Sequence, residues 1–264
     1  MVYMALKQQE KRRILLTVSY DGTAYHGFAA LKNSDLTNLT IEGQLNLAIE
    51  ELTGEKTSVI GASRTDAGVH AYGNLAAFDT TSSIPAQSFA PALNTKLPPD
   101  IRVLLSEPVE TDFHPRKTGW HKTYEYRILN TSLADPISRL YTYPYRAPLQ
   151  IKAMREAALS FAGTHDFASF CASGSQARTT IRHIDSVEVL TQAPSYPTLV
   201  TIRVRGEGFL YHMVRILAGT LLDVGRGRLQ ATAVPDIIAS CDRRLAGATL
   251  PPQGLFLMGY DRSL

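Results

Sequence analysis

The chain has 264 residues, 44% of them hydrophobic, which suits one large globular domain or two of ordinary size. Its net charge of +3 permits an anionic partner without requiring one, and its two cysteines, Cys171 and Cys241, follow no ligand spacing, which argues against a zinc site or a disulfide framework. No apolar run has the length of a membrane span or of a signal-peptide core, so we expect a cytoplasmic protein.

Hydrophobic periodicity predicts a β-α-β-β-α-β succession in the first half of the chain. Its first helix is the clearest element, because apolar residues recur at helical spacing and Gly54 follows as a stop. In chain order the pattern predicts a strand at 14–20, a helix at 41–53, strands at 57–62 and 74–79, a helix after Pro85 and a strand at 101–106.

The second half repeats this order of elements without repeating the sequence. Tyr124, Tyr126 and Ile128 alternate along a strand and share one face. The pattern predicts strands at 122–130, 180–190, 198–206 and 255–260, and helices at 151–162 and 211–224.

The simplest architecture is therefore α+β, with two ferredoxin-like halves whose antiparallel sheets flank a central cleft. We expect an N-terminal domain over 1–116 and a C-terminal domain over 117–264, joined near His114-Pro115-Arg116-Lys117. The connection between the two middle strands of the first half, about Ser63 to Gly73, is longer than a tight hairpin needs, and such loops are often functional.

That connection carries an acid among small residues, in the segment Gly61 to Ala71. Asp66 followed by Ala67-Gly68 is also good turn chemistry, and for an isolated aspartate a turn would be the favoured interpretation. Arg64 offers a nearby cation, however, and a guanidinium favours an ionised carboxylate, which is a competent nucleophile or base.

Arg215 lies on an otherwise apolar helix, where none of its helical neighbours carries an opposite charge. A guanidinium in such a place either reaches solvent along its aliphatic stem or pairs with an acid from elsewhere in the fold. Asp66 would qualify as that acid if the two halves face each other.

Tyr124 has two interpretations. Tyrosine is favoured in strands and packs in cores, but a tyrosine ring is also a stacking surface for a nucleobase, worth about 1–3 kcal/mol per base. A metal-dependent hydrolase built on His165, Asp166 and His212 is a further hypothesis, although these residues lack metal-ligand spacing.

Basic residues recur in the second half and next to the joint. They form either a solvated surface or a groove that follows phosphates. They are Arg116, Lys117, Lys122, Arg178, Arg182, Arg203, Arg205, Arg226 and Arg228.

Taken together, several segments resemble the TruA family of tRNA pseudouridine synthases over about residues 14–260. One such segment would be a weak signal, but this many in one order is a strong one. The matching segments are Tyr20 to Gly27, Gly61 to Ala71, Leu97 to Ile101, Asp112 to Arg116, Lys122 to Tyr126, His165 to Phe167, Phe209 to Arg215 and Gly254 to Leu257.

The resemblance implies an isomerase that converts uridine to pseudouridine at positions 38, 39 and 40 of the tRNA anticodon stem-loop, with Asp66 as the catalytic residue. It implies that Arg64 and Arg215 orient and pair with Asp66, that Tyr124 stacks on the flipped uracil and that Leu255 walls the pocket. It also implies a homodimer that binds tRNA in the cleft. Moving ribose from N1 to C5 of uracil is redox-neutral and hydrolyses nothing, so we expect neither cofactor nor metal.

The chain departs from the family pattern at four positions. Phe28-Ala29 stands where the family usually has Trp-Gln, Ser63 where it has Gly, and Asn74 where it has Gln. We expect Phe28-Ala29 to alter contacts with RNA. A catalytically idle RNA-binding module on the same scaffold is the alternative to an enzyme.

Overall fold

The structure, a computed structural model, describes residues 10–29, 39–193 and 196–261 and divides the chain into two units. The first unit comprises the described residues up to Thr65 together with Ala71–Thr118. The second comprises Asp66–His70 together with the described residues from Gly119 onward. The short segment around Asp66 thus belongs to a different unit from the chain on either side of it.

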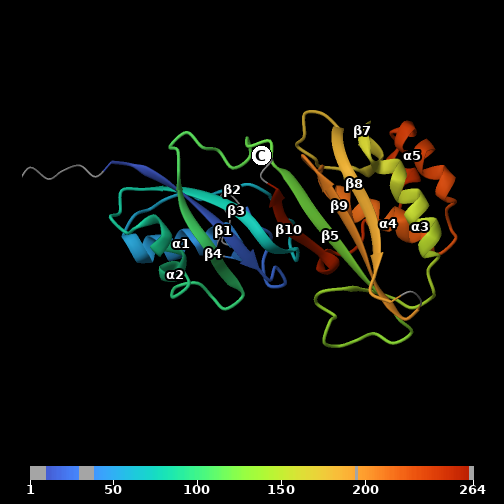
Figure 1. The fold of residues 1–264 in the computed structure, drawn as a ribbon, viewed down its shortest axis with the longest axis horizontal. Helices are drawn as coiled ribbons and strands as arrows, with labels where there is room; N and C mark the ends of the chain where they lie inside the picture. Colours follow the sequence, from blue (N-terminus) through green and yellow to red (C-terminus); the bar gives the residue numbers. More distant parts are fainter. Residues whose placement is uncertain (1–9, 30–38, 194–195, 262–264) are drawn as a thin grey trace, which may run out of the picture. The chain divides into compact units, whose positions relative to one another are not determined.

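The first unit has the predicted succession of elements. They are β1 (Arg12–Tyr20), α1 (Ile41–Thr53), β2 (Ile60–Gly61), β3 (His70–Thr80), α2 (Phe89–Leu93) and β4 (Ile101–Val109). The strands lie in the order β4-β1-β3-β2 and every pairing is antiparallel. Figure 1 shows α1 and α2 side by side.

Helix α1 has the bounds that the sequence predicts, for local reasons. The Thr40 hydroxyl accepts a hydrogen bond from Gly43 N at 3.1 Å and caps the first turn. Gly54 ends the helix in the left-handed conformation, with φ +74°, which favours glycine. Between them Ile41, Leu45 and Ile49 are fully buried.

The second unit also has the predicted order of main elements. They are β5 (His121–Asn130), α3 (Ile151–Ala158), β8 (Ile181–Thr191), β9 (Thr198–Gly206), α4 (Met213–Gly225) and β10 (Leu255–Asp261). The main strands lie in the order β10-β5-β9-β8, and each of these three pairings is antiparallel. In Figure 1 the helices α3 and α4 lie together on one side of this sheet. The protein is therefore a mixed α+β protein with mostly antiparallel pairing.

The sequence pattern did not predict three short elements of this unit: β6 (Tyr143–Tyr145), β7 (Gly163–Asp166) and α5 (Val234–Ser240). Strand β6 pairs parallel with β5 and contains a proline, and β7 adds an edge to β8. All three are too short to establish a hydrophobic period, and α5 carries Pro235 in its first turn.

The two middle strands of the first half have bounds that differ from the predicted ones. The strand predicted at 57–62 forms pairs only at Ile60–Gly61, and β3 begins at His70 rather than at residue 74. The loop that carries Asp66 is accordingly shorter than predicted and ends at Val69. The cleft predicted between the halves stays a prediction.

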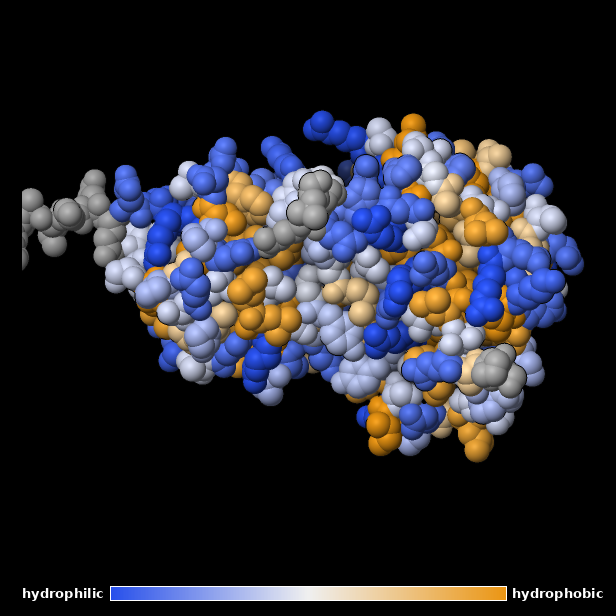
Figure 2. Space-filling view, viewed as in Figure 1, coloured by the Kyte–Doolittle hydropathy of each residue, from blue (hydrophilic) through white to orange (hydrophobic). Residues whose placement is uncertain are grey.

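The described surface mixes polar and apolar side chains. Figure 2 shows hydrophilic residues over much of the face it presents, with hydrophobic residues among them. The most exposed large apolar side chains, Leu133 and Ile137, lie between β5 and β6 and are 80% and 81% exposed. None of the helices in the described residues combines the length and the apolar character that crossing a bilayer requires.

Candidate active site

The Asp66 loop turns tightly and is anchored at its C-terminal end. Val69 N donates to Asp66 O at 3.2 Å, and Gly68 has φ +75°. A Cβ at Gly68 would lie 3.0 Å from Pro252 Cγ, so both the backbone conformation and the close neighbour favour glycine. Asp66-Ala67-Gly68 therefore forms a turn, as its sequence suggests. The side chain of Asp66 makes further contacts beyond this turn.

His70 fixes the end of this loop within the second unit. Its side chain is buried, its Nε2 donates to Leu140 O at 3.0 Å, and its ring stacks on Phe256 of β10 with centroids 4.7 Å apart. An aromatic stack and a buried hydrogen bond together hold the backbone just after Asp66 in one place.

Asp66 forms an ion pair with Arg215. Arg215 Nη1 donates to Asp66 Oδ2 at 3.1 Å, and both side chains belong to the second unit and are largely buried, at 11% and 22% exposed. Arg215 Nε donates to Leu250 O at 2.7 Å, which fixes the guanidinium plane. Of the two outcomes that the sequence left open for Arg215, the structure has the pairing with an acid.

His212 is a second neighbour of the same carboxylate oxygen, with Nε2 3.5 Å from Asp66 Oδ2. It precedes α4 with φ +59° and stacks on Tyr211, centroids 3.8 Å apart. Burial lowers the pKa of His212, the Arg215 and Arg243 charges act in the same direction, and the Asp66 charge opposes them. The imidazole is therefore neutral at neutral pH.

From the sequence, His212 was a candidate metal ligand only, so its contact with Asp66 was not predicted. The signal was its spacing: His212 lies three residues before Arg215, so two side chains can reach one point from the start of the same helix.

Tyr124 and Leu255 lie on neighbouring strands of the second unit. Tyr124 of β5 is 8% exposed and packs its ring edge-on against Phe209, centroids 5.1 Å apart. Leu255 opens β10, is buried, and stands opposite Tyr126 in the β5 pairing. Tyr126 donates its hydroxyl to Pro251 O at 2.8 Å, and burial raises the pKa of that phenol. Core packing is thus part of what Tyr124 does.

Arg64 has a different environment. It is exposed, belongs to the first unit, and has no hydrogen bond or ion pair to any residue within the described ranges. The acid–guanidinium contact in the structure is made by Arg215 instead.

Two of the residues that depart from the family pattern, Ser63 and Asn74, lie in one buried cluster of the first unit. Asn74 Oδ1 accepts from Ser63 N at 3.3 Å, and its Nδ2 donates to Ser63 O at 2.9 Å and to Tyr20 OH at 3.1 Å. The Tyr20 hydroxyl also bonds Thr65 Oγ1 at 2.7 Å, so these contacts fix the backbone that leads into Asp66.

Phe28 packs in the same cluster, and the effect of Phe28-Ala29 on contacts with RNA stays a prediction. Its ring is 1% exposed, lies 6.1 Å from the Tyr20 ring and fills the space beside Gly61. A side chain so completely buried packs the core of the first unit.

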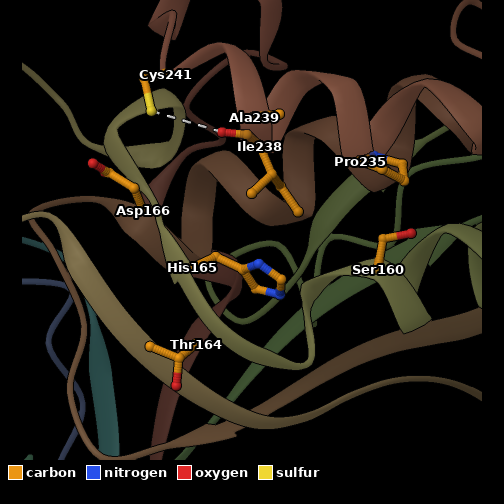
Figure 3. Close-up of a pocket in the computed structure, with 8 residues that line it drawn as sticks. All are labelled: Ser160, Thr164, His165, Asp166, Pro235, Ile238, Ala239 and Cys241. Carbon is orange, nitrogen blue, oxygen red and sulfur yellow. Dashed lines mark hydrogen bonds between the residues drawn. The ribbon is translucent and has the colours of Figure 1, made fainter.

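His165 and Asp166 lie elsewhere in the second unit, beside a pocket of about 380 Å³. Figure 3 shows its wall, with Thr164, His165 and Asp166 from β7 and Pro235, Ile238 and Ala239 from α5. His165 Nε2 donates to Ala162 O at 2.9 Å. Across the described residues, no three His, Cys, Asp or Glu side chains are grouped so that they could hold a metal ion.

Several of the basic residues are already neutralised by acids. The pairs are Arg203 with Glu125, Arg205 with Asp185 and Asp261, and Arg226 with Asp223. For these arginines a solvated, charge-balanced surface describes the structure better than a phosphate-binding groove.

Comparison with known proteins agrees with this geometry. A sequence model of the family described as "tRNA pseudouridine synthase" matches residues 16–116 and 157–261. A protein named "tRNA pseudouridine synthase A" from Ruminiclostridium cellulolyticum is 44% identical over 247 residues, covering 94% of this chain and 98% of the relative. The protein of the same name from Acetivibrio thermocellus is 43% identical with the same coverage, and one from Syntrophomonas wolfei is 44% identical over 93% of this chain and 96% of its own length.

An α+β chain with a partly buried aspartate–arginine pair and these relatives falls in the class of pseudouridine synthases, which are isomerases. The chain belongs to the TruA family of tRNA pseudouridine synthases.

Proposed function

We propose that this protein isomerises uridine to pseudouridine at positions 38, 39 and 40 in the anticodon stem-loop of tRNA, with Asp66 as nucleophile or base. The observation that carries the proposal is the ion pair between Asp66 and Arg215 at the start of α4, in a chain of the TruA family. Family membership supplies the reaction, and the ion pair supplies a carboxylate held in place for it.

The reaction breaks the bond between N1 of uracil and C1′ of ribose and forms a bond between C5 and C1′. The proton on C5 is lost and N1 gains one, so nothing is oxidised, reduced or hydrolysed. Asp66 attacks the sugar or the base, or removes a sugar proton, and the detached uracil must be held while it rotates. This chemistry calls for a positioned carboxylate and an enclosed pocket, and for no cofactor.

The pocket must replace the stacking that the target nucleotide loses when it leaves the RNA helix. Tyr124 supplies an aromatic face for the flipped uracil, and Leu255 closes an apolar wall beside it. Arg215 orients Asp66 from α4, and Arg64, exposed two residues before Asp66, contacts the RNA or the acid when substrate is bound.

We also propose that each unit is a ferredoxin-like half and that the chain divides near residues 116 and 117 into an N-terminal and a C-terminal domain. In both units the order of main elements is β-α-β-β-α-β, which supports this architecture. The protein acts in the cytoplasm as a homodimer, with one tRNA touching both subunits.

The decisive test is tritium release from tRNA that carries 5-tritiated uridine, followed by mapping of the modified positions. The wild type releases tritium, whereas an RNA-binding module would release none. We expect Asp66→Asn and Asp66→Ala to reduce release to background while tRNA binding stays close to the wild-type value.

Asp223→Asn is the matched control, because Asp223 is also paired with an arginine of the α4 region but lies at the far end of the helix. It should keep full activity. Tritium release by Asp66→Ala at the wild-type rate would contradict the proposed role of Asp66.

A further inference from the structure

Arg243 is a partly buried arginine whose charge is balanced by no acid among the described residues. In the described part of the second unit, Arg203, Arg205, Arg226 and Arg244 each form an ion pair with a carboxylate. Arg243 forms none, and burial lowers its pKa. Burying a cation without a counter-charge costs free energy. An anionic ligand bound to Arg243 would offset that cost.

The contacts of Arg243 leave part of its guanidinium open. Nη1 donates to Gly247 O at 2.9 Å and to Ala246 O at 3.3 Å, and Nη2 donates to Thr249 Oγ1 at 3.2 Å. A guanidinium has five N–H groups, so these contacts leave Nε–H and one Nη2–H without a partner among the described residues. Among the described residues, every buried side-chain nitrogen has a hydrogen-bond partner. Because Arg243 Nε has none, this atom is not buried and solvent can reach it.

The segment that Arg243 contacts is the one that holds Arg215. Gly247 N donates to Thr220 Oγ1 of α4 at 2.8 Å, and Leu250 exchanges hydrogen bonds with Arg215 through Leu250 N and Leu250 O. The Arg243 charge also acts on His212, whose imidazole is 3.5 Å from Asp66. Arg243 therefore lies beside the candidate active site.

We propose that Arg243 binds a backbone phosphate of the RNA substrate next to the nucleotide on which Asp66 acts. The proposal rests on the proposed function, since it requires an RNA in the site. Arginine matches a phosphodiester well, because two N–H groups can donate to two phosphate oxygens. Its three contacts to the chain hold the guanidinium plane ready, so little side-chain entropy is lost when the phosphate arrives.

The test compares two neighbouring arginines by the salt dependence of tRNA binding. Arg243→Gln should bind tRNA roughly tenfold more weakly at low salt and reduce the slope of log affinity against log salt by about one. Arg244→Gln is the matched control, because Arg244 is 89% exposed and already paired with Asp242. It should leave both quantities unchanged.

Arg243→Lys separates charge from structure. A lysine keeps the positive charge but cannot make the three contacts of the guanidinium, so phosphate binding predicts a slope near the wild-type value together with a lower melting temperature. If Arg243→Gln and Arg243→Lys both lower the melting temperature and both keep the wild-type slope, Arg243 only braces the segment and the inference is wrong.

The same measurements distinguish this inference from the proposed function. Wild-type protein that binds tRNA with a slope that depends on Arg243, but releases no tritium, would overturn the proposed function and leave the phosphate contact standing. Wild-type protein that releases tritium, with a slope that Arg243→Gln does not change, would overturn the phosphate contact alone.

Discussion

The two oxygens of the Asp66 carboxylate are not equivalent. Arg215 and His212 both approach Oδ2, whereas Oδ1 has no hydrogen-bond partner among the described residues. A carboxylate held by one oxygen keeps a fixed orientation and leaves the other free to react. If Asp66 acts as proposed, Oδ1 is the oxygen that reacts, and Arg215 and His212 determine its direction.

His212 gives the protein a pH-dependent stability with a defined sign. Its pKa is lowered in the folded state, so between that value and the ordinary value of 6.5 the unfolded chain binds a proton that the folded chain does not. His212 thus destabilises the fold progressively as the pH falls through that window. Urea unfolding of wild type and His212→Gln should show the wild type losing more stability on acidification.

His165→Gln is the control for this comparison, since His165 lies on β7, away from Asp66. It should follow the wild-type pH dependence. If His212→Gln and the wild type lose equal stability between neutral pH and pH 5, the imidazole does not carry the effect.

At the scale of elements, the contact between α4 and the segment before β10 sets the position of Arg215. A Cβ at Gly219 would lie 2.0 Å from Ala248 O, and one at Gly247 would lie 2.4 Å from Gly219 C. Backbone approaches backbone here, so neither position has room for a side chain. The two glycines allow Leu250 to reach Arg215.

Gly219→Ala should therefore displace this segment. We expect a loss of about 1–3 kcal/mol in the free energy of unfolding, as for other overpacked sites, together with a lower rate of pseudouridine formation. Urea titration and tritium release measure the two effects.

Gly225→Ala is the matched control in the same helix. The nearest atoms to its added Cβ belong to the side chains of Met154 and Leu149, not to backbone, so we expect a smaller displacement than at Gly219. It should retain activity. A Gly219→Ala variant as stable and as active as the wild type would show that the segment adjusts without cost.

The sequence predicted long, capped or strictly alternating elements well and short ones badly. Thr40 and Gly54 delimit α1 by local hydrogen bonds and backbone conformation, so sequence alone locates it. Strand β2 was predicted but is shorter than its local pattern, because its ends depend on pairing with β3, and no local pattern marks β6 and β7, which depend on a partner strand.

The residues of the candidate site also differ in how far the sequence predicts their contacts. For Arg215 the sequence left two outcomes open, and pairing with an acid was one of them, but the contacts of His212 and Arg243 depend on how α4 meets distant segments. Such contacts follow from tertiary packing, which spacing alone does not reveal.

At the scale of the whole molecule, the proposed homodimer can be measured directly. Light scattering coupled to size-exclusion chromatography should give twice the chain mass of 29.0 kDa, without RNA and at moderate salt. A mass of one chain across the working concentration range would contradict a stable dimer and confine any pairing to the RNA-bound state.

The position of Asp66 has a consequence for how the protein is made. Asp66 and Arg215 are 149 residues apart in the chain, and the acid belongs to the unit whose remaining residues are synthesised later. While the chain is on the ribosome, the aspartate emerges long before the arginine that orients it. A nascent or truncated chain therefore has Asp66 without its arginine partner, and the ion pair cannot form until translation is almost complete.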